Sequence, residues 1–247
     1  MSVRAMRCVA LMTAAWLAVT ALSVAGQETE VFVLGALGAL HDREESFDFE
    51  TLERVIRAIG PQVLLLEVTP EELRDRLDTR GRPEYPNVVW PMLGEARGPE
   101  SYAMEAGEPL YGELTSEGSE LWTAFQNERP TESAAFAAYA EAATDVLLAR
   151  WKSPADTQDE ATDALARSQR RLRAALVPAV GWIQVRWDRV MLDVATKAIA
   201  QNPGKRVLVL GSHHNSGMFV EALGELPGVR LVDMRSWLVG NGFGGPL

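Results

Sequence analysis

Four short apolar runs predict β-strands that are buried on both faces. Each run is rich in leucine or β-branched residues and is too short to be a typical helix. The near-continuous hydrophobicity of the runs is typical of strands in a parallel sheet that is covered on both sides. The four predicted strands are Val31–Ala36, Val63–Val68, Arg206–Ser212 and Val229–Met234.

Two amphipathic segments connect these strands in pairs. Phe49–Ile59 carries apolar side chains at helical spacing and is followed by Gly60-Pro61, so it predicts a helix between the first two strands. Ser216–Leu226 predicts a second helix, between the last two strands. Repeated strand–helix–strand units predict an α/β fold, with a mostly parallel central sheet and helices on both faces.

The middle of the chain predicts a helical insertion, over about residues 98–200, within this α/β core. Residues 131–151 are rich in alanine and predict one helix. Residues 156–200 predict one long helix or two, bent near Pro178 and Gly181.

Prolines and glycines interrupt residues 80–130, which therefore predict only short helical pieces. Residues 28–247 are numerous enough for one well-buried core, and we expect them to form a single domain.

The first 25 residues predict a signal peptide. Arg4 and Arg7 precede an apolar run, and Ser23-Val24-Ala25 has the small residues typical of a signal-peptidase site. An uncleaved membrane anchor is the alternative, because the run is nearly long enough to span a bilayer. We expect an exported protein, periplasmic or secreted, without a membrane span in the mature chain.

The charge and the cysteine content narrow the range of partners. The chain has 24 Lys and Arg against 34 Asp and Glu, a net charge of −10. Such an acidic protein is unsuited to nucleic acid or anionic lipid. The single cysteine, Cys8, lies in the predicted leader, so neither a disulfide nor thiol chemistry is expected in the mature domain. A small molecule or a peptide is the expected substrate.

All three histidines follow predicted strands. His41 completes a G-x-x-H motif that begins at Gly38, and His214, preceded by His213, completes a second one that begins at Gly211. The carboxyl ends of parallel strands meet at one edge of the sheet, where open α/β sheets bind ligands. The two motifs are therefore expected to meet at one site.

Glu67 lies at the end of the second predicted strand and should reach the same edge. Imidazole and carboxylate groups are good ligands for Mn, Co, Zn or Fe. We predict that His41, Glu67 and His214 bind a divalent metal ion, with His213 as a further candidate ligand. The alternatives are a metal-free site, with a histidine as general base and Glu67 orienting it, or histidines that cap helices and bond loops.

Gly38 and Gly211 have a predicted role of their own in this site. Glycine permits tight turns and lets backbone amides approach a bound group closely. Both glycines are therefore candidate cofactor-binding positions.

This layout resembles the TraB/Tiki superfamily, which also includes PrgY and GumN-type proteins and erythromycin esterases. Its members have two G-x-x-H motifs, a glutamate at a strand end, and an arginine shortly before the second motif. Arg189 in WDRVMLDVATKAI best matches that arginine, with Arg186 as the alternative register. A surface ion pair of Arg189 with Asp188 or Asp193 is the competing interpretation.

The resemblance implies metal-dependent peptide cleavage, as in some branches, or ester cleavage, as in others. Glu67, Arg189 and His214 would then be catalytic, and Arg189 would stabilise a substrate carboxylate or an oxyanion. Another branch binds haem, so a non-catalytic protein that binds haem, a metal or another ligand through the same histidines is the second hypothesis. A partner-binding module that uses the alanine-rich helices is the third.

Overall fold

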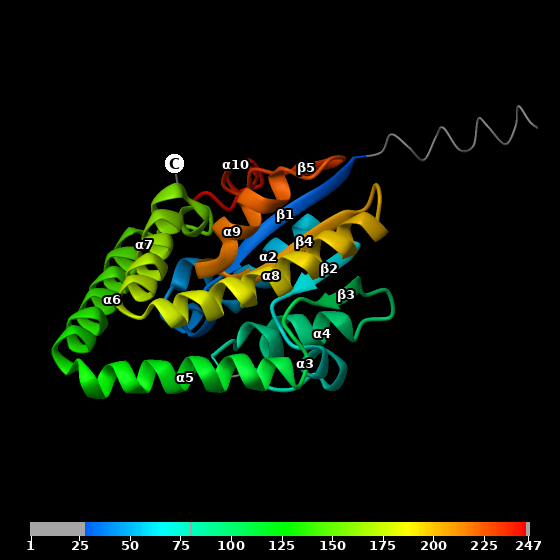
Figure 1. Ribbon diagram of the computed structural model, residues 1–247. Coiled ribbons are helices and arrows are strands. Elements are labelled where there is room, and N and C mark those ends of the chain that lie inside the picture. Colours follow the sequence, from blue (N-terminus) through cyan, green and yellow to red (C-terminus); the bar gives the residue numbers. More distant parts are fainter. Residues whose placement is uncertain (1–27, 80, 246–247) are drawn as a thin grey trace, which may run out of the picture.

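A computed structural model of the protein describes residues 28–79 and 81–245, and the predicted leader lies outside them. Five strands form one all-parallel sheet in the order β3-β2-β4-β1-β5 (Figure 1). The predicted α/β class is confirmed. The strands are Thr29–Ala36 (β1), Val63–Leu66 (β2), Glu100–Ala103 (β3), Arg206–Ser212 (β4) and Val229–Leu231 (β5).

The helices alternate with these strands or follow them in long runs. The longer ones are α2 (Phe49–Ile59), α5 (Leu110–Glu128), α6 (Pro130–Arg150), α7 (Glu160–Leu176), α8 (Pro178–Gln201) and α9 (His213–Gly224). The shorter ones are η1 (Gly38–Asp42), η2 (Glu45–Phe47), α3 (Pro70–Asp75), η3 (Tyr85–Val89), α4 (Trp90–Leu93), η4 (Asp156–Gln158) and α10 (Met234–Gly240). Within the described ranges, no helix is both long enough and apolar enough to cross a bilayer.

Two hydrophobic cores flank the sheet, because successive side chains of each strand point to opposite faces. Phe32 and Leu34 of β1 pack on one face with residues of α2, η3, α4 and α10. Val31 and Val33 pack on the other face with residues of α8 and α9. The prediction of helices on both faces is therefore confirmed, and burial on both faces explains why the central strands have no polar side.

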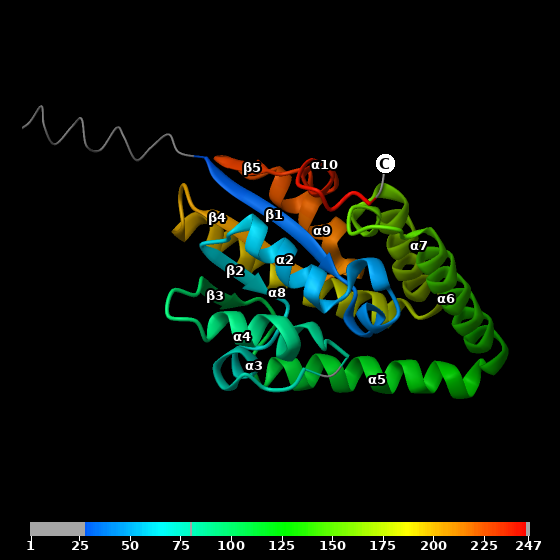
Figure 2. The ribbon, with the colours of Figure 1, turned by 180° about the vertical axis from the view of Figure 1, so that it is seen from behind.

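The helical insertion forms arms beyond the carboxyl edge of β1 and β4. Helices α5, α6 and α7 extend past that edge in both views (Figures 1 and 2). As predicted, α6 forms one helix, and the following segment divides at Val177, where Pro178 begins α8. The expectation of only short helical pieces before residue 130 was wrong, because α5 is 19 residues long.

Other elements also differ from the prediction, and β2 ends at Leu66 rather than at Val68. β3 was not predicted, and it joins the edge of the sheet, so the helical part begins at Leu110 rather than at about residue 98. The last strand ends at Leu231, because the Asp233 carboxylate accepts from the Ser236 N–H and caps α10. α9 begins at His213 rather than at Ser216, because the Ser212 hydroxyl caps it.

Candidate functional site

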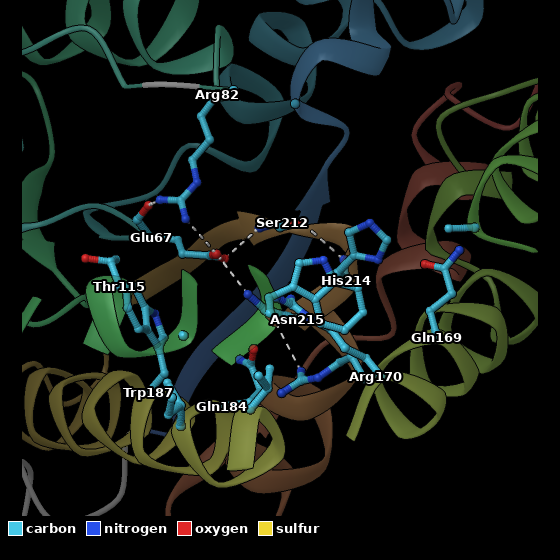
Figure 3. Close-up of a pocket in the computed structure, with 18 of the residues that line it drawn as sticks. Glu67, Arg82, Thr115, Gln169, Arg170, Gln184, Trp187, Ser212, His214 and Asn215 are labelled. Atoms are coloured by element: carbon cyan, nitrogen blue, oxygen red, sulfur yellow. Dashed lines mark hydrogen bonds and ion pairs between the residues drawn. The ribbon is translucent and has the colours of Figure 1, made fainter. Parts of the chain in front are cut away.

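A cavity of about 1060 Å³ lies at the carboxyl edge of the sheet. The loop after β1, the end of β2 and the start of α9 line one side of it, and residues of α5, α6, α7 and α8 line the other (Figure 3). Its volume is at the upper end of the usual range for small-molecule sites. The edge where ligands were expected therefore carries a cavity, and the helical insertion supplies one of its walls.

Glu67 is held by donors from three parts of the chain. Its side chain is only 3% exposed, and Oε2 accepts from the backbone N–H of Ser212 at 2.7 Å. Oε1 accepts from Asn215 Nδ2 at 2.8 Å and from Arg82 Nη2 at 3.2 Å (Figure 3). Both carboxylate oxygens are thus engaged by protein donors, and Glu67 ties the end of β2 to the start of α9.

The glycines of the two motifs make room for protein atoms. A β-carbon at position 211 would lie 2.5 Å from Glu67 Oε2, so only glycine leaves space for this carboxylate. Gly38 has φ +59°, and a β-carbon there would lie 2.8 Å from the Gly81 carbonyl oxygen. The close approach expected at these positions therefore occurs between parts of the site itself.

Arg82 joins Glu67 to a second buried carboxylate, Glu105, whose Oε1 lies 2.7 Å from Arg82 Nη2. Glu84 lines the same part of the cavity, and its Oε2 has no hydrogen-bond partner among the described residues. Burial raises the pKa of Glu84 and of Glu105 to about 7, although the charge of Arg82 acts in the opposite direction. Near neutral pH, these two carboxyl groups are therefore partly protonated.

His213 and His214 lie in the first turn of α9, and their rings are 4.0 Å apart between centroids. His213 is buried, and its Nδ1 lies 3.3 Å from the carbonyl oxygen of Ala36, to which the Nδ1–H donates. Burial lowers the pKa of His213 to about 3, so this imidazole is neutral. It supports the ring of His214.

His214 is exposed within the cavity, and no described residue hydrogen-bonds its ring. Burial among the cavity walls and the nearby charge of Arg170 lower the pKa of His214. Its imidazole is therefore neutral at pH 7 and keeps a free lone pair. It can accept a proton, or it can accept a hydrogen bond from a ligand.

A relay of hydrogen bonds connects the sheet edge to the helical arms (Figure 3). Asn215 donates to Glu67 through Nδ2, and its Oδ1 accepts from Arg170 Nη1 at 3.1 Å. Arg170 of α7 also pairs with Asp188 of α8. The cationic group beside His214 is thus fixed from both sides.

His41 is engaged by its own loop. It is 2% exposed, its Nδ1–H donates to the Phe47 carbonyl oxygen, and its Nε2 accepts from the Leu37 N–H at 3.0 Å. Desolvation lowers the pKa of His41, in keeping with a neutral ring that donates and accepts once each. His41 does not line the cavity, whereas Gly38, Glu67, His213 and His214 do.

Arg189 is exposed on α8 and does not line the cavity either. Arg186 lies at the surface, with Nη1 3.4 Å from Glu117 Oε2. The structure thus does not bring the arginine expected from the family motif to the site. The arginines that line the cavity are Arg82, Arg170 and Arg173.

The predicted metal ligands do not fit one ion in this arrangement. Both ring nitrogens of His41 and both carboxylate oxygens of Glu67 are bonded to other groups. In the part of the chain that the structure describes, no group of three or more His, Cys, Asp or Glu residues is placed to hold a metal ion. The divalent ion stays a prediction that elemental analysis can test.

Several cavity residues were missed by sequence reasoning. Glu105 follows β3 as Glu67 follows β2, so recognition of that strand would have found it. Asn215 adjoins the second motif directly. The sequence around Arg82 and Arg170 has no motif that marks them as site residues. They reach the site only because of the way that a loop and the helical insertion fold.

No protein-family model, curated protein or solved structure matches this chain. The resemblance to the TraB/Tiki superfamily therefore rests on the layout of its motifs and stays a proposal.

Proposed function

We propose that the protein is an exported hydrolase of peptide or ester bonds, with His214 as its general base. The observation that carries this proposal is a neutral imidazole, unbonded among the described residues, exposed in a cavity of about 1060 Å³. The motif layout shared with the TraB/Tiki superfamily and the predicted leader support the reaction class and the export.

The chemistry follows from the groups that line the cavity. His214 takes a proton from water as the water oxygen attacks the substrate carbonyl, and it later returns that proton to the leaving nitrogen or oxygen. Arg170 carries a positive charge near His214 and is held by Asp188 and Asn215. A fixed cation of this kind stabilises the negative charge that develops on the carbonyl oxygen.

Ligand binding without turnover is the second candidate function. Trp122, Phe136 and Trp187 contribute aromatic surface to the cavity. Aromatic surface beside polar groups is also typical of ligand-binding sites. The free imidazole of His214 would then contact a ligand such as haem or a metal complex without acting as a base.

Turnover by the full chain, purified without a histidine tag, tests the hydrolase proposal. Fluorogenic peptides and p-nitrophenyl esters are offered with a chelator and, separately, with added Mn²⁺, Co²⁺ or Zn²⁺, and metal content is measured. His214→Gln should slow turnover about 10²- to 10⁴-fold, as expected for loss of a general base. The control Arg189→Gln, outside the cavity, should keep the wild-type rate.

Two outcomes would contradict the proposal. One is a wild-type protein that cleaves none of these substrates under any metal condition. The other is a folded His214→Gln variant with an unchanged rate. Turnover that is lost with the chelator and restored by one metal would support the predicted divalent ion.

A further inference from the structure

The helical wall of the cavity is cationic and aromatic, unlike the sheet edge. The last ten residues of α7 contain four arginines, in a chain whose net charge is −10. Two of them, Arg170 and Arg173, line the cavity. Such a local concentration of positive charge in an acidic protein attracts anions to one place.

The two cavity-lining arginines of α7 differ in their partners. Arg170 is held by Asp188 and by the side-chain oxygen of Asn215, so part of its guanidinium is already engaged within the protein. Arg173 has no carboxylate partner among the described residues, and its guanidinium lies 4.9 Å from the ring centroid of Trp122. Arg173 is thus a positioned cation with its hydrogen-bond donors available.

Apolar side chains also line the helical wall of the cavity. Trp122 of α5 contacts Phe136 of α6 edge-to-face, with 5.4 Å between ring centroids, and both line the cavity. Val180 and Ile183 of α8 line it as well. A ligand complementary in charge and polarity to this wall would have a negative group next to an apolar or aromatic group.

Other charged groups of the cavity bear on where such a ligand would bind. Arg82 also lines the cavity, and it is paired with the carboxylates of Glu67 and Glu105. A ligand carboxylate should therefore favour Arg173, which has no carboxylate partner among the described residues, over Arg82, which has two. His214 lines the same cavity, and Arg170, three residues before Arg173 on α7, lies close enough to lower the pKa of this histidine.

We propose that Arg173 and Trp122 bind the free carboxylate and apolar side chain of an acylated amino acid, such as the C-terminal residue of a short peptide. Planar guanidinium groups bind carboxylates through two parallel hydrogen bonds, and Trp122 limits the orientations of the guanidinium. The binding claim stands alone, whereas the claim that this ligand is the substrate rests on the proposed hydrolase function.

A matched pair of probes tests the carboxylate requirement. N-acetylphenylalanine and N-acetylphenylalaninamide differ only in a carboxylate and a neutral amide of similar shape. Isothermal titration calorimetry on the full chain should show at least about tenfold tighter binding of the acid, the usual advantage of a charge-assisted hydrogen bond. Arg173→Gln should remove this preference, and Arg173→Lys should keep part of it.

Arg171→Gln is the matched control. It makes the same charge change on the same helix, but Arg171 does not line the cavity. The preference for the acid should persist in this variant. The proposal is overturned if wild-type protein binds neither probe, if it binds both equally, or if Arg171→Gln and Arg173→Gln reduce the preference alike.

The binding and turnover experiments can fail independently, so they test the carboxylate subsite and the hydrolase function separately. Hydrolysis of peptides or esters, together with equal binding of the two probes, would refute the carboxylate subsite and leave the hydrolase proposal intact. Binding selective for the acid, without turnover of any substrate, would support the subsite in a protein that binds its ligand and does not cleave it.

Discussion

Glu84 and Glu105 are the residues at which the fold opposes ionisation most clearly. Burial raises the pKa of both from the ordinary value of 4.5 to about 7. Between pH 4.5 and 7, the folded chain keeps protons that the unfolded chain has lost. The contribution of these carboxyl groups to stability is therefore present at low pH and is lost as the pH rises through 7.

The effect of His213 on the pH dependence of stability has the opposite sign. Burial lowers the pKa of His213 to about 3 from the ordinary 6.5, so the unfolded chain binds the extra proton first. Its contribution to stability is present above pH 6.5 and is lost as the pH falls towards 3. The free energy of unfolding of the wild-type protein thus contains the pH dependence of both the carboxyl groups and the histidines. A comparison of wild type with a glutamate variant at each pH separates the carboxyl contribution.

We expect Glu84→Gln to gain stability relative to wild type as the pH rises from 5 to 8. Glutamine resembles the protonated acid and cannot be forced to ionise, while the histidines are the same in both proteins. A shift of one pKa unit corresponds to about 1.4 kcal/mol, so the relative gain should be on the order of 2 kcal/mol. Urea unfolding at pH 5 and pH 8 measures it, and a pH-independent difference would contradict the burial of an ionisable Glu84.

At the scale of elements, the junction of β4 and α9 organises the site. β4 pairs with β1 and β2 in parallel register, so its carboxyl end lies between the other two strand ends. Ser212 caps the following helix and donates its backbone N–H to Glu67. The junction thereby places His213, His214 and Asn215 in one helical turn against the cavity.

Gly211→Ala tests this junction. The added β-carbon would lie 2.5 Å from Glu67 Oε2, so the carboxylate must move from its hydrogen bonds with Ser212 and Asn215. We expect a loss of about 1–3 kcal/mol in the free energy of unfolding, measured in urea.

Gly118→Ala is the control for Gly211→Ala. The nearest atoms to a β-carbon there are 3.9 Å away, and the residue lies within α5. Alanine should stabilise this helix by about 0.5–1 kcal/mol. Equal effects of the two substitutions would refute a special role for Gly211.

The elements that could be predicted from the sequence are those whose pattern is set by the core. α2 has the predicted bounds, because its apolar stripe lies between the Asp48 cap and Gly60, which has a left-handed backbone. α5 escaped prediction because it contains two glycines and fully buries only Leu114 and Phe125. β3 is a four-residue edge strand without a fully buried residue, so it gives no hydrophobic signal.

At the scale of the molecule, the cavity forms where the α/β core meets the helical insertion. The sequence could place Glu67, His213 and His214 at the core side, because strand ends are visible in the hydrophobic pattern. It could not place Arg170, Arg173 or Trp122, since their approach depends on how α5 and α7 fold back over the sheet edge. The sequence thus predicts the residues on the sheet side of the cavity but not those on the helical side.

The two G-x-x-H motifs have different roles in the structure. His41 bonds the backbone of its own loop through both ring nitrogens, whereas His214 presents a free ring to the cavity. The sequence pattern and the family resemblance treat the two histidines alike. Replacing each histidine in turn distinguishes different roles for His41 and His214 from a shared role.

The most direct measurement is turnover per folded molecule, with urea unfolding, for His41→Ala and His214→Ala side by side. We predict that His41→Ala loses about 1–3 kcal/mol of stability, because it leaves buried backbone groups unpaired, and keeps its turnover. His214→Ala should keep its stability within about 0.5 kcal/mol and lose turnover. If both variants lose turnover and bound metal together, with stability unchanged, the two histidines share one metal site, which contradicts different roles for the two motifs.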